Sequence, residues 1–488
     1  MQGKLKVGRS AIVTLVIVLV IVLVIGACGS EPAPEQADAP APMPDAAAAG
    51  PAVFCADPVV APASGLDVLA ALQQLPGVAG ASESAAGLIG YRFFTFTFRQ
   101  LVDHGAAGGA TFTQRVTVLH RGASAPTVLG TQGYDLAQRP FREEPTILLT
   151  ANQVEVEHRF FTPSRPDPVD WSKLTIWQAA ADDHCLTLAM KTLYPGRWLD
   201  TGQSKGGLSA VLYRRFFPDD VDATIAYVAP LSLGAPDPRY VAAVETGSHP
   251  DCRLALRDFQ RLAVGHRADV VAMMTSDLPG VTFDVLGVDE AFEHLVLELP
   301  FGFWQYGTSG DCANVPGPSA TSADIFTYLE DVGQISLYGD GQIAHYGPYY
   351  EQAATQLGFP EIDESNLTGL LSHPGTDVAP SYVPAGAPTA YDPAPMRDLD
   401  AWVHTQGLRL LFVYGANDPW SAGMFELGDA VDSFRYVVAD GNHGAQIGQL
   451  STTDRNAARA ALARWMDVAV TAIVTEPAKP ERGARRKL

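Results

Sequence analysis

Residues 197–210, RWLDTGQSKGGLSA, contain the pattern that decides the fold. The apolar residues before Thr201 predict a short β-strand, and the residues after Ser204 predict a helix. Gly202 and Gly206 flank the serine as GxSxG, and glycines allow a backbone to turn sharply without Cβ clashes. Alone, GxSxG is also typical of an ordinary glycine-rich turn. A strand, a tight turn with a serine and a helix in succession predict a nucleophile elbow.

Strands and helices alternate on both sides of this elbow. Apolar, β-branched and aromatic runs predict strands at residues 91–98, 112–119, 127–130, 146–150, 197–201, 408–414 and 434–439. Helical patterns occupy residues 174–191, 208–217 and 453–470. Such alternation predicts a mostly parallel sheet with helices on both faces. The expected fold class is α/β, with an α/β-hydrolase core.

An interruption divides this core. Between residues 234 and 395 the pattern changes to helical segments broken by loops rich in glycine and proline. We expect a helical cap at 234–395, inserted between two parts of the core at 61–233 and 396–470. Two consecutive domains are the alternative, but the second would have too few strands for a sheet of its own.

The N-terminal residues predict export. Basic residues precede an apolar run at 11–27, so residues 1–28 are expected to be a signal peptide. The run ends at Cys28 in a segment that resembles the bacterial lipobox, which predicts a lipidated Cys28 and stable attachment to a membrane at the cell envelope, on the outer membrane or the cell surface. An uncleaved transmembrane helix is the alternative. Residues 29–60 are expected to form a disordered tether, and residues 471–488 a disordered tail.

Composition excludes some classes of partner. The chain has 33 Lys and Arg against 54 Asp and Glu, a formal net charge of −21. Such an acidic protein repels phosphate backbones, so we expect no nucleic-acid partner. The sequence has no CxxC, no His-rich cluster and no glycine-rich nucleotide motif, so we expect no metal and no cofactor.

Four cysteines follow Cys28, and an exported protein is free to oxidise them. Four cysteines allow three pairings. We favour Cys252 with Cys312, both in the expected cap, and Cys55 with Cys185. Free buried thiols are the alternative.

A serine nucleophile needs a base, and the base needs an acceptor that fixes its tautomer. Asp418 follows the strand predicted at 408–414, and His443 follows the strand predicted at 434–439. Both therefore lie at the carboxyl edge of the sheet together with Ser204, in the chain order Ser, Asp, His of α/β-hydrolases. Asp418 before a proline is also good turn chemistry, which is the alternative for that residue.

Other residues are candidates for substrate contacts. The oxyanion requires N–H donors, and we expect them from the backbone of Lys205 and, after the strand predicted at 127–130, of Tyr134. That second loop could instead be an ordinary glycine turn. Glu157 could receive a substrate's α-ammonium group, or it could pair structurally with an arginine such as Arg159.

Five blocks in order resemble peptidase family S37, the secreted bacterial prolyl tripeptidyl aminopeptidases, and more distantly the prolyl carboxypeptidases. They are residues 96–104 (FTFRQLVDH), 157–161 (EHRFF), 201–207 (TGQSKGG), 299–306 (LPFGFWQY) and 417–420 (NDPW). The likeness covers about residues 66–470. The lipobox departs from the secreted pattern of that family.

The resemblance implies a serine aminopeptidase that releases short N-terminal fragments, tripeptides above all, after proline. It assigns the triad roles to Ser204, Asp418 and His443. It also implies a proline pocket walled by aromatic residues, for which the candidates are Phe301, Phe303, Trp304 and Trp420. Such a cluster is more often part of a hydrophobic core, which is the alternative for these residues. A lipase or esterase, and a surface protein that only binds, are the other functions that this fold allows.

Overall fold

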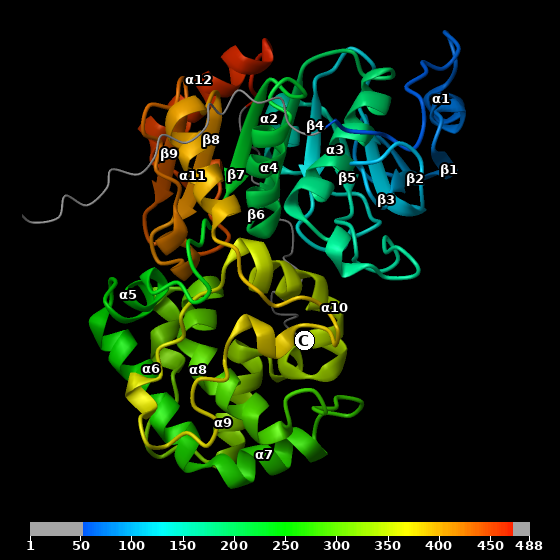
Figure 1. The fold of residues 1–488 in the computed structure, drawn as a ribbon. Helices are drawn as coiled ribbons and strands as arrows, with labels where there is room; N and C mark the ends of the chain where they lie inside the picture. The colour runs from blue at the N-terminus through cyan, green and yellow to red at the C-terminus, as the bar shows by residue number, and fades with distance from the viewer. Residues whose placement is uncertain (1–51, 472–488) are drawn as a thin grey trace, which may run out of the picture. The chain divides into compact units, whose positions relative to one another are not determined.

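The computed structural model describes residues 52–471, and these contain a sheet of nine strands (Figure 1). Along the sheet the order is β1-β2-β3-β5-β4-β6-β7-β8-β9. The strands are β1 (Val78–Ser84), β2 (Arg92–Leu101), β3 (Thr111–His120), β4 (Thr127–Thr131), β5 (Asn152–Val156), β6 (Trp198–Gln203), β7 (Ala223–Tyr227), β8 (Leu410–Gly415) and β9 (Phe434–Val438). Neighbours from β1 to β5 are antiparallel, and all other neighbours are parallel.

Helices cover both faces of the sheet. They are α1 (Val68–Gln74), α2 (Glu144–Leu149), α3 (Ile176–Lys191), α4 (Lys205–Phe216), α11 (Ala394–Gln406) and α12 (Thr452–Met466). Because side chains alternate along a strand, β8 serves both faces. Leu410 and Phe412 pack with α3, α4 and α11, which lie on one face in Figure 1, whereas Leu411 and Val413 pack with α2 and α12. This arrangement confirms the predicted α/β-hydrolase fold.

Between β7 and β8 the chain forms helices and no strand. These are α5 (Arg239–Glu245), α6 (Pro250–Gly265), α7 (Arg267–Ser276), α8 (Val288–Tyr306), α9 (Ser322–Tyr328) and α10 (Asp340–Gln352), with shorter helical turns between them. They bury a hydrophobic core of their own, which includes Leu256, Phe259, Phe292 and Leu295. A disulfide between Cys252 and Cys312 lies within this helical region. We refer to residues 234–393, which lie between β7 and α11, as the cap.

One predicted strand is wrong. Residues 146–150 belong to α2 and the turn after it, and the strand lies further on, at β5. Pro145 stands in the first turn of α2, where its missing N–H costs nothing. A short apolar run that is buried on all sides has no periodicity with which to separate helix from strand. Strands β1 and β7 and helix α1 were not predicted, because β1 is a mostly exposed edge of small residues and the other two are short.

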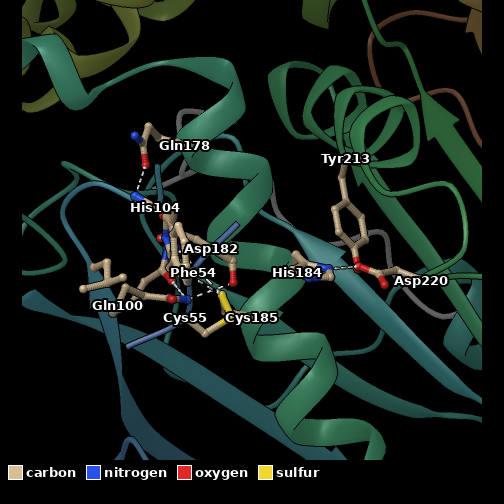
Figure 2. The surroundings of a disulfide bond; sticks show 12 residues. Phe54, Cys55, Gln100, His104, Gln178, Asp182, His184, Cys185, Tyr213 and Asp220 are labelled. Atoms are coloured by element: carbon tan, nitrogen blue, oxygen red, sulfur yellow. Dashed lines mark hydrogen bonds and ion pairs between the residues drawn. A yellow bond between two sulfur atoms is a disulfide. The ribbon is translucent and has the colours of Figure 1, made fainter. Parts of the chain in front are cut away.

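The tether predicted at 29–60 is wrong over its last part. The backbone N–H of Phe54 donates to the carbonyl of His104 at 2.9 Å, and Cys55 forms a disulfide with Cys185 of α3 (Figure 2). Asp57 pairs with Arg99 of β2. The disulfide, the hydrogen bond of Phe54 and the packing of Val53 against the core thus hold this segment in place. The predicted signal peptide, Cys28, the earlier tether and residues 472–488 lie outside the described residues.

Candidate active site

Ser204 stands at the turn between β6 and α4. Its backbone has φ 57° and ψ −128°, a conformation that L-residues rarely adopt. A Cβ on Gly202 would lie 2.3 Å from the backbone of Gly206, and a Cβ on Gly206 would lie 2.6 Å from the Thr131 carbonyl oxygen. Because both contacts are with backbone, neither position accepts a side chain. The two glycines allow strand and helix to approach closely enough for Ser204 to project at the sheet edge.

Asp418 and His443 follow β8 and β9 at the same edge. His443 Nδ1 and Asp418 Oδ2 are 2.7 Å apart, and both side chains are buried. An ionised carboxylate only accepts hydrogen bonds, so Nδ1 carries the proton and Nε2 is the basic nitrogen. The backbone N–H of Trp420 donates to the other carboxylate oxygen at 3.1 Å. This bond orients Asp418, which in turn fixes the tautomer of His443.

The loop after β4 carries Gly133 and Tyr134. Lys205 Nζ donates to the Gly133 carbonyl oxygen at 2.8 Å, and the His158 N–H donates to the Tyr134 carbonyl at 3.0 Å. In a trans peptide the C=O and N–H point in opposite directions. With its carbonyl held by Lys205, the Gly133–Tyr134 peptide directs the Tyr134 N–H away from that side chain. Lys205 is buried, and burial lowers its pKa to about 7.

The backbone N–H of Lys205 is the other expected oxyanion donor. Lys205 is the first residue of α4, so its N–H has no acceptor within the helix. A helix N-terminus also carries partial positive charge, which favours a developing anion there.

Glu157 does not occupy the place expected for a substrate carboxylate. Its side chain is fully buried, and it accepts hydrogen bonds from Arg115, from the Ser164 hydroxyl at 2.5 Å and from the Leu136 N–H at 2.8 Å. The structural alternative therefore holds, although the partner is Arg115 rather than Arg159. Through Leu136, Glu157 anchors the loop that carries Tyr134.

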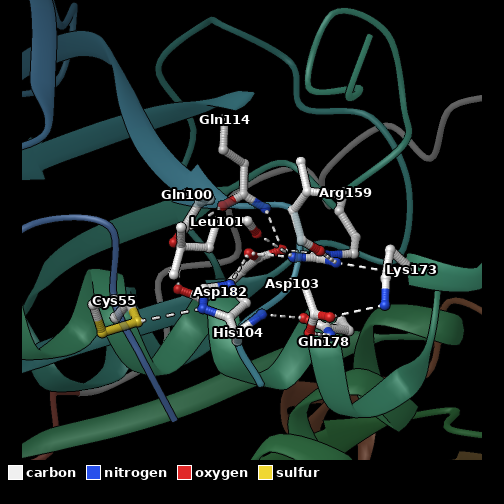
Figure 3. Close-up of polar contacts among 12 residues, drawn as sticks. Cys55, Gln100, Leu101, Asp103, His104, Gln114, Arg159, Lys173, Gln178 and Asp182 are labelled. Carbon is white, nitrogen blue, oxygen red and sulfur yellow. Dashed lines mark hydrogen bonds and ion pairs between the residues drawn. A yellow bond between two sulfur atoms is a disulfide. The ribbon is translucent and has the colours of Figure 1, made fainter. Parts of the chain in front are cut away.

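Arg159 has a different partner. Its guanidinium makes two hydrogen bonds to Asp182 of α3, at 2.7 and 2.8 Å (Figure 3). His104 Nε2 lies 2.8 Å from the same carboxylate, and His104 Nδ1 lies 2.8 Å from the Phe54 carbonyl oxygen. The cluster links the end of β2, α3 and the segment before Cys55. Arg159 is thus buried with its charge paired inside the protein.

A cavity of about 680 Å³ opens onto Ser204 and His443. A cavity of this size is typical of sites for small ligands and short peptides. The core contributes Tyr134 and Trp420 to its lining, and the cap contributes Phe301, Gln305 and Tyr306. The ring centroids of Phe301 and Trp420 are 5.1 Å apart at 76°. These rings form an apolar corner beside His443.

Two of the four predicted pocket aromatics lie elsewhere. Phe303 and Trp304 pack in the hydrophobic core of the cap and do not line the cavity. Residues of one helix face recur every three or four positions, so Phe301 and Gln305 face the cavity while Phe303 and Trp304 point away from it. The sequence predicts one aromatic surface, but the turn of α8 places Phe301 on the cavity face and Phe303 and Trp304 on the face that packs in the cap.

Further residues of the cap line the cavity and are not predicted from the sequence. They are Glu298, Val332, Leu337, Tyr338, Tyr346, Tyr349, Tyr350, Phe359 and Ile362. An aromatic-rich run at 345–350, HYGPYY, was a visible signal for part of this set. No local pattern indicated Glu298, because a single glutamate in a helix is usually a surface residue.

The cap is bonded to the loop that carries His443. The His443 N–H donates to the Gln305 carbonyl oxygen at 3.0 Å, and Asn442 Nδ2 donates to the carbonyls of Tyr306 and Gly307 at 3.0 and 3.2 Å. The last carbonyls of a helix lack donors within it, so the end of α8 offers them to this loop. Gln203 Nε2 holds the His443 carbonyl from the core at 2.9 Å. The position of His443 thus depends on both core and cap.

Residues 52–471 contain neither a group of metal-ligating side chains nor a helix that could span a membrane. No three side chains of His, Cys, Asp or Glu in that range are grouped as metal ligands. No helix there is both long enough and apolar enough to cross a bilayer.

Similar proteins of known sequence or structure include peptidases. The chain is 41% identical over 432 residues to the prolyl tri/tetrapeptidyl aminopeptidase of Streptomyces mobaraensis, and the match covers 87% of this chain and 90% of that protein. Similar solved structures include VinJ, with 10% identity and a TM-score of 0.34 over 80% of this chain and 99% of that one. The proline iminopeptidase of Mycobacterium smegmatis has 11% identity and a TM-score of 0.30 over 80% and 98%. Because these TM-scores are low, the fold assignment depends on the sheet order and the elbow described above.

A family model gives the decisive match. Residues 61–485 match the PS-10 peptidase S37 model, which spans both parts of the core and the cap. The resemblance inferred from five sequence blocks is thereby confirmed. The chain belongs to peptidase family S37 and is a serine peptidase.

Proposed function

We propose that this peptidase releases short peptides, mainly tripeptides, from free N-termini by cleavage after proline. The observation that carries the proposal is the cavity in which Ser204 and the Asp418–His443 pair meet the aromatic corner of Phe301 and Trp420. The name of the Streptomyces relative supports the same reaction.

The reaction is acyl transfer in two steps. Ser204 Oγ attacks the prolyl carbonyl carbon while His443 Nε2 takes its proton, and the tetrahedral oxyanion receives hydrogen bonds from the N–H groups of Lys205 and Tyr134. The intermediate breaks the C–N bond, and His443 returns the proton to the leaving amine. Water then attacks the acyl-enzyme with His443 again as base, which releases the peptide and restores Ser204.

The corner formed by Phe301 and Trp420 receives the proline ring. Aromatic faces suit a compact apolar ring that has few rotamers to lose on binding. The cap covers the cavity, so an extended chain end enters while a folded domain is excluded.

The test is hydrolysis of p-nitroanilides that end in proline or alanine, with free or acetylated N-termini, by wild type and Ser204→Ala. We expect release after proline, reduced by acetylation and abolished in the variant. Hydrolysis of simple esters alone would replace the proposal with an esterase. No hydrolysis, together with a Ser204 that does not react with a fluorophosphonate, would leave a binding protein.

We also propose that the protein is exported and held at the cell envelope by a lipid on Cys28. The support is the sequence around Cys28, which lies outside the described residues. The test is fractionation and mass spectrometry of wild type and Cys28→Ser. We expect the wild type in membranes with acyl chains on Cys28 and the variant without them; an unmodified Cys28 would overturn the proposal.

A further inference from the structure

An aminopeptidase that requires a free N-terminus needs an acceptor for the α-ammonium group, and Glu157 is not available for that role. Three other carboxylates line the cavity, those of Asp135, Glu143 and Glu298. Asp135 directly follows Tyr134 of the expected oxyanion loop and faces His345 at 3.7 Å. It therefore lies near the scissile bond, whereas the amine of a tripeptide lies at the far end of the fragment.

Helix α8 connects the triad with Glu298. Near its C-terminal end, Gln305 binds the N–H of His443. Glu298, Phe301, Gly302 and Gln305 all line the cavity, and their spacing of three, four and seven positions is that of one helix face. This face therefore runs from the triad, past Phe301 of the apolar corner, to the carboxylate of Glu298.

The length of this face matches a tripeptide. Glu298 lies seven residues before Gln305, which is about 10 Å along the axis at a rise of about 1.5 Å per residue. Three residues of extended peptide span about 10 Å from the amine nitrogen to the last carbonyl carbon. A peptide with its prolyl carbonyl at Ser204 thus brings its amine to the level of Glu298.

We propose that the Glu298 carboxylate binds the α-ammonium group of the substrate and thereby selects fragments of three residues. This inference rests on the proposed prolyl aminopeptidase activity and assigns the residue that gives that activity its preference for a free N-terminus.

The surroundings of Glu298 suit a single negative charge. The Tyr338 hydroxyl donates to Glu298 at 2.7 Å, which orients the carboxylate. Asp377 lies behind it, buried, with an Oδ2 atom that no donor in the described chain reaches. Burial and the Glu298 charge raise the pKa of Asp377 well above its usual value, so Asp377 keeps its proton and donates it to Glu298. The pair therefore carries one charge, which an ammonium group neutralises.

Glu298→Gln tests the assignment, because the amide keeps the size of the side chain and still accepts from Tyr338. The substrates are Ala-Ala-Pro-p-nitroanilide with a free and with an acetylated N-terminus. We expect the ratio of their kcat/KM values to fall by roughly 10- to 150-fold, the value of a hydrogen bond to a charged group. The decrease comes from a lower kcat/KM for the free peptide, whereas kcat/KM for the acetylated peptide is expected to change little.

The matched controls are Asp135→Asn and Glu143→Gln, which remove the other carboxylates of the same cavity. We expect both to keep the wild-type ratio, and we expect only Glu298→Gln to lose the preference for Ala-Ala-Pro over Ala-Pro and Ala-Ala-Ala-Pro. Labelling of Ser204 by a fluorophosphonate at the wild-type rate shows that each variant is folded.

The possible failures are distinguishable. If wild type cleaves free prolyl tripeptides and Glu298→Gln keeps the wild-type ratio, the assignment of Glu298 is wrong while the proposed function stands. A ratio lost in Asp135→Asn or Glu143→Gln would move the ammonium site to that residue. If wild type cleaves no prolyl peptide, the proposed function itself fails.

Discussion

His443 Nδ1 lies 2.7 Å from Asp418 Oδ2, and the side chains of both residues are buried. Because the carboxylate holds the proton on Nδ1, Nε2 is unprotonated and can act as the general base. Asp418→Asn would favour the opposite tautomer without changing the shape of the site. We expect kcat to fall by about 10⁴-fold with little change in KM. Steady-state kinetics with a prolyl tripeptide substrate measure this, and a decrease of less than tenfold would remove Asp418 from the triad.

Lys205 holds the Gly133 carbonyl, and we expect that bond to position the Tyr134 N–H. Lys205→Met removes the bond while its unbranched chain fills most of the same volume. Removing an oxyanion donor outright costs about 10²–10³-fold in kcat, so an indirect effect is expected at roughly 10- to 100-fold. The rate of fluorophosphonate labelling should fall in parallel, because that reaction also develops negative charge on oxygen. A variant with wild-type kcat would show that Tyr134 is positioned without Lys205.

Glu157 provides a contrast with Glu298, because both are glutamates near the site and only one faces the cavity. Glu157→Gln weakens the bonds to Arg115, Ser164 and Leu136, and we expect it to lower the free energy of unfolding by about 1–3 kcal/mol. Through Leu136 it should also lower kcat for free and acetylated peptides equally. Urea unfolding and the ratio of the two kcat/KM values measure these effects. A ratio that falls in Glu157→Gln would return Glu157 to the substrate site.

The preference for a free N-terminus should depend on pH. Burial raises the pKa of Glu298, so its charge, and with it the preference, is lost as pH falls through that raised value. At high pH the preference is lost again as the peptide amine deprotonates near about pH 8. The groups that face Glu298 are Tyr338, Tyr349, Tyr350, Tyr382 and the protonated Asp377.

Burial raises the pKa of each of those tyrosines, so they stay neutral over this range. The measurement is the ratio of kcat/KM for free and acetylated peptides from pH 5 to about pH 9. We expect a maximum in wild type and a profile in Glu298→Gln that lacks the acidic limb. A wild-type ratio that is flat across the range would contradict the assignment.

The disulfide between Cys55 and Cys185 closes a loop of 130 residues. A cross-link over so long a loop restricts the unfolded chain by up to about 5 kcal/mol on the chain-entropy model. We expect Cys55→Ser/Cys185→Ser to lower the free energy of unfolding by about 2–5 kcal/mol and to release residues 54–57 to proteases. Urea unfolding and limited proteolysis check both effects. The matched control, Cys252→Ser/Cys312→Ser in the cap, should leave residues 54–57 protected.

The fold class and the elbow could be predicted from local sequence, because periodicity and the spacing of GxSxG depend on neighbouring residues only. The places of Asp418 and His443 followed from one further rule, that parallel strands end at a common edge. The strand predicted at residues 146–150 is wrong for the same reason. A short run that is buried on every side has no periodicity that distinguishes a strand from a helix such as α2.

The lining of the cavity depended on tertiary structure. The local sequence does not show which of Glu157 and Glu298 faces the cavity. Arg115, 42 positions before Glu157, binds Glu157, whereas Glu298 lies on the face of α8 that lines the cavity with Ser204. The phase of that helix also separates Phe301 from Phe303 and Trp304. Sequence patterns thus predict the type and order of the long periodic elements, because these depend on neighbouring residues. The environment of a charged or aromatic side chain depends instead on which distant residues the packed chain brings against it.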